Sequence, residues 1–540
     1  MHPRRQSAHG LYKRAQARAR AREGGVTPPR VVAEPVGGGP LARAAVEGRT
    51  PPGWYAPRPM GAAAWRAHAE QVRAQCRSDW LSALAPAFNA SGAAAKRLES
   101  VAQGRGIVIT TGQQPGLFGG PGYTWLKALS ARALADRIEQ ATGIPAAPVF
   151  WAATDDADFA EASWTAVAFD EEVRRLRIER QGFDGQVMAE QPLGDVSRLF
   201  EELSAAAGSA PHLDVLEHVR RAYRPDATVG SAYVELLRAL FEPMGIAVLD
   251  AWHPAVRDAA RPTLVEALRR APVIDEGVSL RSVAIERAGF RAQVARVPKL
   301  SLVFRVSANG VKERIPIAQA GDVAVQPQLV LSANVLLRPI VERAIMPTVG
   351  YFGGPGEVAY FAQVGAVAEA LGVPVPLVLP RWSATIIEPV IDRMLGRLGM
   401  VFDDIKPPHQ AERRMGDRAM PAFVRDTLES LRRDVDARLN ALRDSAEGAA
   451  MVHASTIEGT RHQLKYRVDR LERRYRTAAL KAETAWLRDL GSVRAALMPE
   501  GKRQERVLNP LPLVARHGES LMDLLRAGAA MHAAQLLGGA

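Results

Sequence analysis

Three aspartates that follow one apolar run are the residues best suited to acid–base chemistry. The run Ala147 to Trp151 is followed closely by Asp155, Asp156 and Asp158. Crowded carboxylates repel one another, which raises at least one pKa and suits a general base, and they also bind Mg²⁺. The alternatives are a cap for the next helix and ordinary solvation in a loop.

A glycine-rich loop, TTGQQPGLFGGPGY, precedes these acids and could approach a ligand closely. Glycines let backbone N–H groups come near a ligand, and the following helix N-terminus favours an anion. Phosphate or carboxylate binding is one interpretation, and a tight turn that needs positive φ is the other. The loop is neither a Walker A loop nor GxGxxG. The candidate substrate-binding residues here are Thr111, Gly112, Gln113, Gln114, Gly119, Gly120 and Tyr123, with Lys127 as a point charge for the anion or as a solvated side chain.

A second glycine-rich loop, GGPGE, begins at residue 353 and leads into another predicted helix. An arginine at a strand end can clamp a substrate carboxylate with two hydrogen bonds, and a salt bridge to Glu357 is the alternative. The candidate substrate-binding residues of this region are Asn334, Arg338, Gly353, Gly354, Gly356, Glu357, Tyr360, Arg381 and Ser383.

Both loops belong to the same structural plan. Ile107 to Ile109 is a short β-branched run, a helix is expected from about Tyr123 to Gln140, and Ala147 to Trp151 reads as a second strand. The same order of strand, loop, helix and strand recurs around the second glycine-rich loop and ends in a strand at Val375 to Leu379. Two βαβ halves of one parallel sheet present their loops at the carboxyl ends of the strands, where open α/β sheets bind ligands. We therefore expect an α/β protein with a Rossmann-type parallel-sheet core and one cleft shared by both loops and the acids.

The pattern of apolar residues changes after Pro407, where they follow a heptad repeat. Two long helices that fold back near Gly448 are predicted to form an antiparallel coiled-coil arm. Such an arm usually packs on a partner chain, so a homodimer is expected, and a solitary surface helix pair is the alternative. The apolar positions are Leu428, Leu431, Val435, Leu439 and Leu442 in the first helix and Leu464, Val468, Leu471, Tyr475, Ala478 and Ala482 in the second.

The predicted organisation has six segments. They are a disordered Arg-rich tail at 1–35, the first part of the core at 36–164, an inserted mixed α/β connecting region at 165–330, the second part of the core at 331–405, the coiled-coil hairpin at 406–498, and a C-terminal segment at 499–540 that packs back on the core.

The composition excludes several classes of protein. Over 540 residues, 47% hydrophobic and 24% charged residues are typical of a globular chain, and no apolar window is long enough to span a membrane. The single cysteine, Cys76, cannot form an intramolecular disulfide, which favours a cytoplasmic location. Most of the net charge of +12 lies in residues 1–60, with 11 Lys or Arg against 3 Asp or Glu. The rest is nearly balanced, so no specific nucleic-acid partner is expected.

Several long blocks, in one order, resemble the BshC family of bacillithiol biosynthesis. They are TTGQQPGLFGGPGYTWLKAL, PVFWAATDDADF, NVLLRPIVERAIMPTVGYFGGPGEVAYFAQV, PRWSATIIEP and PEGKRQERVLNPLPL. The resemblance implies a Rossmann-type core with inserted connecting regions, similar in style to class I aminoacyl-tRNA synthetases, and a coiled-coil arm that mediates dimerisation. It also implies a ligase that forms a carbon–nitrogen amide bond by adding L-cysteine to glucosaminyl-malate, the last step towards bacillithiol.

The sequence departs from the family pattern beside the acids. Members typically read E-D-H-D-F with a further histidine a few residues on, whereas this chain has Ala157 and Trp164 at those places. An imidazole would carry protons near neutral pH and alanine cannot. We therefore expect Asp156 and Asp158 to take the amine proton or to hold a metal, although no metal ligands are assigned; ATP or ADP and Mg²⁺ stay open as cofactors. The alternatives are a diverged, non-catalytic dimeric binding or scaffold protein and a ligase for a different amino-sugar acid.

Overall fold

The computed structural model describes residues 28–538, which divide into two units. The first unit holds the described residues up to 167, residues 174–386 and residues from 504 on; the second holds residues 168–173 and 387–503. Residues 1–27 of the expected tail lie outside the described part. The end of that tail is not disordered, because β1 (Arg30–Ala33) pairs with β12 (Ala384–Ile387), and Glu34 N donates to Ser383 O at 2.9 Å.

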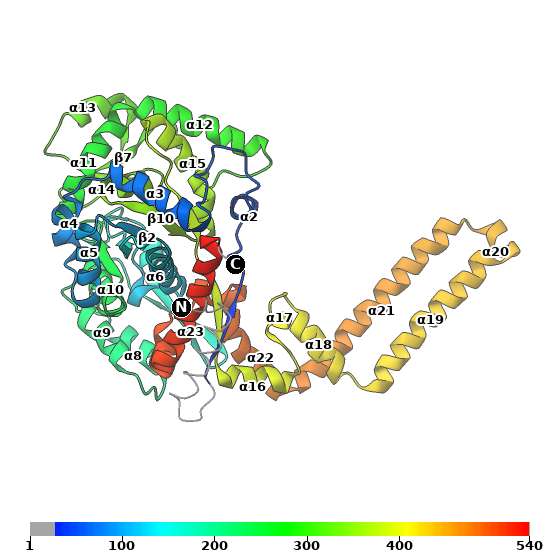
Figure 1. Cartoon of the computed structure of the whole chain (residues 1–540). Coiled ribbons are helices and arrows are strands. Elements are labelled where there is room, and N and C mark those ends of the chain that lie inside the picture. Colours follow the sequence, from blue (N-terminus) through cyan, green and yellow to red (C-terminus); the bar gives the residue numbers. More distant parts are fainter. Residues whose placement is uncertain (1–27, 539–540) are drawn as a thin grey trace, which may run out of the picture. The chain divides into compact units, whose positions relative to one another are not determined.

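A five-stranded parallel sheet forms the centre of the first unit (Figure 1). Its strand order is β11-β10-β2-β3-β6, so the first strand lies in the middle and the chain adds two strands on each side, the arrangement of a Rossmann-type sheet. The predicted fold class is confirmed. The bounds are β2 (Ile107–Gln113), β3 (Ala146–Ala152), β6 (Ala247–Asp250), β10 (Thr348–Gly353) and β11 (Val378–Pro380).

Strand β6 corrects the expected division of the chain. It lies within 165–330, the segment predicted to be an insertion, yet it pairs in parallel with β3 from Val149↔Ala247 to Ala152↔Asp250. Part of that segment therefore completes the core sheet.

Two βαβ units build the sheet, as predicted. Helix α6 (Tyr123–Thr142) connects β2 to β3 and ends at Gly143, whose φ of +71° is accessible to glycine at little cost. Helix α15 (Pro355–Leu371) connects β10 to β11, begins with proline at its first position and ends at Gly372. Because α15 is buried on nearly every side, it is apolar all round rather than amphipathic.

Helices cover both faces of the sheet. On one face, Trp65 of α3 (Gly61–Gln75) and Leu536 of α23 (Leu511–Leu537) pack with Ile138 of α6. The C-terminal segment thus packs back on the core, as predicted. The other face is covered by residues of α4 (Trp80–Phe88), α5 (Gly92–Gln103) and α11 (Pro254–Arg269).

A smaller antiparallel sheet lies in the connecting region. Its order is β8-β7-β9, with β7 (Leu300–Val306), β8 (Lys312–Pro316) and β9 (Val330–Ala333). It packs with α12 (Ala271–Arg287), α13 (Ala320–Ala324) and α14 (Arg338–Ile345). The remaining elements of this unit are α2 (Pro40–Val46), η1 (Leu117–Gly119), α7 (Phe159–Ala162), α8 (Ser197–Ala207), α9 (Asp214–Ala222), α10 (Val229–Phe241), η2 (Glu242–Met244), η3 (Ile317–Gln319) and η5 (Gln504–Arg506). The hairpin of β4 (Trp164–Phe169) and β5 (Glu172–Arg177) spans the boundary between the units.

The second unit contains the predicted helical hairpin. Helices α19 (Ala422–Asp444) and α21 (Ala454–Ala482) pack side by side and are joined through α20 (Ala446–Met451). Leu428 and Val468 meet between them, and Arg432 of α19 forms ion pairs with Asp469 and Glu472 of α21. The unit also contains α16 (Pro389–Leu398), α17 (Phe402–Ile405), α18 (Gln410–Ala419), α22 (Thr484–Leu497) and η4 (Pro499–Gly501).

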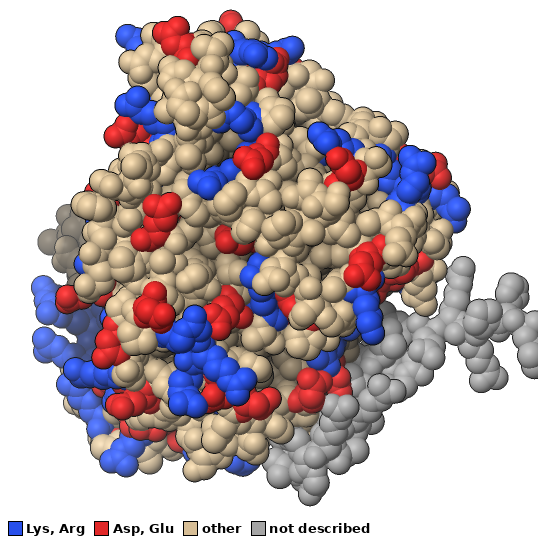
Figure 2. Space-filling view, turned by 90° about the vertical axis from the view of Figure 1, so that its left-hand side faces the viewer, with Lys and Arg blue, Asp and Glu red and all other residues tan. Residues whose placement is uncertain are grey.

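Charges are mixed on the surface that Figure 2 presents. Acidic and basic side chains are interspersed there, and no large area of one sign is visible on that face. Within residues 28–538, no helix combines the length and the apolar character that crossing a membrane requires.

Candidate active site

The two glycine-rich loops meet at one edge of the sheet. Strands β2 and β10 are neighbours, with Thr111 paired to Phe352, although their loops are far apart in the sequence. The chain order reverses direction between these two strands, and such a switch point is where open parallel sheets bind ligands. The predicted convergence of the loops is confirmed.

Lys127 ties the two loops together instead of facing a ligand. It is 2% exposed, and its ammonium donates to Gly112 O at 2.7 Å and Gln113 Oε1 at 2.9 Å and lies 2.5 Å from Glu357 Oε2. Burial lowers the pKa of Lys127, and Glu357 opposes that shift. Since all three N–H donors have protein acceptors, the expectation that Lys127 offers its charge to an anion, or is solvated, is wrong.

Glu357 anchors the second loop at the start of α15. Its Oε2 accepts from Gly354 N at 2.7 Å, and Tyr351 OH donates to its Oε1 at 2.5 Å. Burial by itself would raise the pKa of Glu357, but Lys127 and these hydrogen bonds hold the pKa below its ordinary value. The carboxylate thus caps its own helix, and the helix N-terminus is occupied by the protein.

Arg338 lies beside this group at the start of α14. Its guanidinium stacks over the Tyr351 ring at 4.6 Å and pairs with Glu342 at 2.7 Å. Thr110 donates to the same Glu342 and so links β2 to α14, whereas Thr111 donates to Phe352 O at 2.8 Å and links β2 to β10.

The first loop folds on itself, which corrects the expected anion cradle. Gly119 N donates to Gly116 O, and Gly120 N donates to Leu117 O. Gly119 and Gly120 have φ of +86° and +75°, and the Tyr223 hydroxyl donates to Gly116 O at 3.2 Å. These glycines serve the tight turn that was the alternative interpretation.

The glutamines of this loop differ in their bonding. Gln113 is held by Lys127, and its Nε2 donates to the Tyr123 hydroxyl at 3.4 Å. Gln114 Nε2 is buried and has no acceptor in the described part of the chain. Gln114 is therefore the loop residue with a donor left for a ligand.

Arg381 is committed to a protein carboxylate. Its two terminal nitrogens donate to Glu505 at 2.9 and 2.7 Å, and Ser383 Oγ donates to the same carboxylate at 2.8 Å. Arg381 and Glu505 are at most 2% exposed. The expectation that Arg381 clamps a substrate is corrected, because its fork of donors already holds Glu505. Its partner is not Glu357, the alternative considered from the sequence.

The three aspartates have three different environments. Asp155 Oδ2 accepts from Ser332 at 2.8 Å, and Lys312 donates to the Asp155 carbonyl at 2.8 Å. Asp158 caps α7 by accepting from Glu161 N at 3.1 Å, the structural alternative considered above. Asp156 Oδ1 accepts from Asp158 N at 3.0 Å. Burial is the main cause that raises the pKa of Asp156, and neighbouring Asp155 adds to it.

Glu161 joins these acids and was not predicted. Burial, followed by the charges of Asp158 and Asp156, raises its pKa, and Tyr123 OH donates to it at 3.5 Å. A glutamate three residues after an aspartate is the pattern of a helix start, so the position of Glu161 does not by itself indicate a site.

A small pocket lies where β3 and β6 end. Ser332 and Arg338 enter it from β9 and α14, opposite Asp155. Trp252 and Arg257 also line it, with the guanidinium stacked over the indole at 4.6 Å. We call this the edge pocket. Ser332, Trp252 and Arg257 carry no motif, so only the folded structure brings them together.

Asn334 does not line the edge pocket. Its Oδ1 accepts from Leu336 N and Leu337 N, both at 3.0 Å, and so holds the turn that leads into α14. Gly356 and Tyr360 belong to α15, and Gly353 ends β10. Burial raises the pKa of Tyr360, and the nearby charge of Arg338 opposes that shift.

Ala157 and Trp164 stand at the two places where the expected family pattern has histidine. Ala157 lies between two of the aspartates, and Trp164 begins β4 with Arg175 stacked over its ring at 4.5 Å. Across residues 28–538, no group of three or more His, Cys, Asp or Glu side chains is arranged to hold a metal ion.

The fold defines a Rossmann-type protein with a helical C-terminal domain. Comparison with protein families finds the N-terminal Rossmann-like domain of the bacillithiol biosynthesis protein BshC over residues 54–330 and 322–382, and the C-terminal coiled-coil domain of BshC over residues 384–534. The chain belongs to the BshC family.

Three relatives share this similarity along most of their length. A protein of Solibacter usitatus is 31% identical over 82% of this chain and 86% of its own. One of Koribacter versatilis is 30% identical over 81% and 84%, and one of Symbiobacterium thermophilum is 31% identical over 78% and 81%. Each is named "Putative cysteine ligase BshC".

Proposed function

We propose that this protein is a cysteine ligase that joins L-cysteine to glucosaminyl-malate through an amide bond, in the last step of bacillithiol biosynthesis. Family membership across both domains is the observation that carries the proposal. The relatives' name supports cysteine as one substrate, and the choice of glucosaminyl-malate rests on the family's pathway.

Amide formation requires an amine that has lost its proton and a carboxyl group that is activated. Asp156 is the group best suited to accept the proton, because its raised pKa makes it a stronger base than an ordinary aspartate. Glu161 lies in the same acidic group and has a raised pKa too. These carboxylates would do the work of the imidazole that Ala157 cannot supply.

An acidic substrate such as glucosaminyl-malate needs cationic partners. Arg338 and Arg257 line the edge pocket, and Arg257 has no carboxylate partner among the described residues. An arginine without a protein counter-ion favours a carboxylate ligand. Arg257 takes the carboxylate-binding role that was expected of Arg338 or Arg381.

The test is the substitution Asp156→Asn, measured as cysteine-dependent formation of product from glucosaminyl-malate. We expect kcat to fall by about 100-fold or more, the usual contribution of a positioned base. Asp226→Asn is the matched control, since Asp226 is 82% exposed beside Arg224. Full turnover by the Asp156 variant would remove this residue from the chemistry.

Calorimetry separates the ligase from the non-catalytic alternative. Titration with glucosaminyl-malate, cysteine and ATP in turn gives heats of binding for each component. Binding without any product would favour a diverged scaffold, and binding of other amino-sugar acids alone would favour a changed substrate.

We also propose that the protein is cytoplasmic and forms a homodimer through α19 and α21. Apolar heptad residues of these helices stay exposed within one chain, including Leu431 at 41%, Leu464 at 40% and Leu471 at 41%. Exposed leucines in a heptad row are typical of a helix that packs on a partner.

A further inference from the structure

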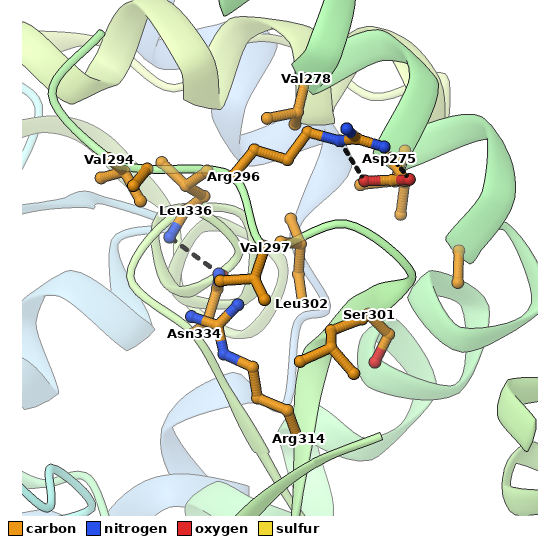
Figure 3. Close-up of a pocket in the computed structure, with 14 residues that line it drawn as sticks. Asp275, Val278, Val294, Arg296, Val297, Ser301, Leu302, Arg314, Asn334 and Leu336 are labelled. Carbon is orange, nitrogen blue, oxygen red and sulfur yellow. Dashed lines mark hydrogen bonds and ion pairs between the residues drawn. The ribbon is translucent and has the colours of Figure 1, made fainter. Parts of the chain in front are cut away.

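A second pocket is lined by other residues than the edge pocket and is not used by the proposed chemistry. Figure 3 shows it between α12 and β7, with Asn334 and Arg314 reaching into it. Ser332 lines the edge pocket and Asn334 lines this one, and the two pockets have no lining residue in common. We call it the Asn334 pocket.

Asn334 brings an unused donor to this pocket. The residue is 6% exposed, and its Oδ1 is held by two backbone N–H groups. Its Nδ2 donates to no acceptor within residues 28–538. An amide that satisfies its oxygen and leaves its nitrogen without a protein acceptor offers that donor to water or to a ligand.

Arg314 brings a charge with no counter-ion. In the described part of the chain no carboxylate lies within ion-pair distance of it, and its recorded partner is the Phe304 ring at 5.3 Å. Burial lowers its pKa, and no acid opposes that shift. The neighbouring Arg296 is different, because Asp275 holds it with two hydrogen bonds of 2.7 and 2.6 Å.

We propose that the Asn334 pocket binds a small organic carboxylate, whose oxygens accept hydrogen bonds from Arg314 and from Asn334 Nδ2. Two donors, one of them charged, converge without an acceptor, and a carboxylate supplies both the oxygens and the charge. A water molecule would supply an oxygen but would leave the guanidinium unpaired.

The wall opposite these donors sets the kind of carboxylate. Ile274, Val278 and Leu302 line the pocket with aliphatic side chains. A compact acid with a short aliphatic chain matches this combination of a polar end and an apolar wall. The inference does not rest on the ligase function, because none of these residues lines the edge pocket.

Titration of the full-length protein with ¹³C-carboxyl propionate, followed by line broadening in NMR spectra, tests the proposal. We expect saturable broadening with a dissociation constant of about 10 mM or below. The substitutions Arg314→Met and Asn334→Asp should each raise that constant by about tenfold or more. Asn334→Asp keeps the Oδ1 that holds the turn before α14 and removes only the donor, so it reports on binding even where Arg314→Met unfolds.

Arg305→Met is the matched control, since Arg305 is a half-exposed arginine of the same sheet that pairs with Glu313. It should bind propionate as the wild type does. Equal binding by all four proteins would overturn the proposal. So would binding that survives in both pocket variants and is lost in Arg338→Met, because propionate would then occupy the edge pocket. Loss of turnover in Asp156→Asn with propionate binding retained would bear on the ligase function alone.

Discussion

Lys127 and Glu357 form an ion pair that joins the two halves of the sheet, with 2.5 Å between Nζ and Oε2. Lys127 lies on the helix that follows β2, and Glu357 lies on the helix that follows β10. Both glycine loops are therefore fixed to each other by one charged contact, reinforced by the Lys127 hydrogen bonds to Gly112 and Gln113. The contact prevents the two loops from separating at the switch point.

Replacing Lys127 by Met should strongly destabilise the protein. Glu357 would stay largely buried without its cation, and breaking a buried pair on one side costs about 3–5 kcal/mol. The free energy of unfolding in urea measures this loss.

The double variant Lys127→Met with Glu357→Gln is the control for that prediction. It removes both charges, so it should recover a part of the stability that the single variant loses. Strictly additive losses in the two single variants and the double variant would contradict the coupling.

Replacing Arg381 by Met should lower stability rather than substrate affinity. Glu505 is 2% exposed and would be left buried without its partner, at a cost of about 3–5 kcal/mol. Arg381→Lys should restore only a part, since lysine lacks the planar fork of donors. Thermal unfolding together with KM for glucosaminyl-malate distinguishes a structural role from a substrate-binding role. A large rise in KM at unchanged stability would show that Arg381 binds the substrate.

Asp156→Asn should stabilise the protein while it reduces turnover. Because the folded-state pKa of Asp156 is raised above 3.8, the folded protein holds this proton more tightly than the unfolded chain, and stability falls as pH rises through that window. Asparagine keeps the acceptor for Asp158 N and carries no charge. We expect a gain of about 1 kcal/mol at neutral pH that disappears below pH 3.8 in urea unfolding curves. An equal gain at every pH would contradict the titration.

Leu464→Gln combined with Leu471→Gln should weaken self-association. Both leucines are about two-fifths exposed within one chain, so the substitutions disturb its own packing little. We expect the dimer dissociation constant to rise by about tenfold or more in sedimentation experiments. Leu213→Gln, at a 55% exposed position of the first unit, should leave association unchanged.

The elements and their order could be predicted from local signals. The β-branched run at Ile107 marks a strand that is buried on both faces, and glycines 143 and 372 stop the helices that follow the two loops. The heptad rows marked the hairpin, because Leu428 and Val468 must be covered by a neighbouring helix.

The partners of the charged residues could not be predicted in the same way. Arg381 pairs with Glu505, which lies 124 residues later in the chain, and no spacing rule connects the two. Lys127 shows a motif position, yet its carboxylate partner Glu357 comes from a helix that only the folded sheet brings near. Strand β6 was missed because four residues, AVLD, are too short a pattern to separate from a loop.

The late placement of Glu505 and α23 affects how this chain matures on the ribosome. Helix α23 supplies Leu536 and Leu537 to the layer under α6, and Glu505 neutralises Arg381 inside the first unit. A nascent chain that has emerged only as far as the helical arm lacks both. The first unit therefore completes its core only after residues 505–537 have been synthesised, so products that terminate before them should be cleared by proteolysis.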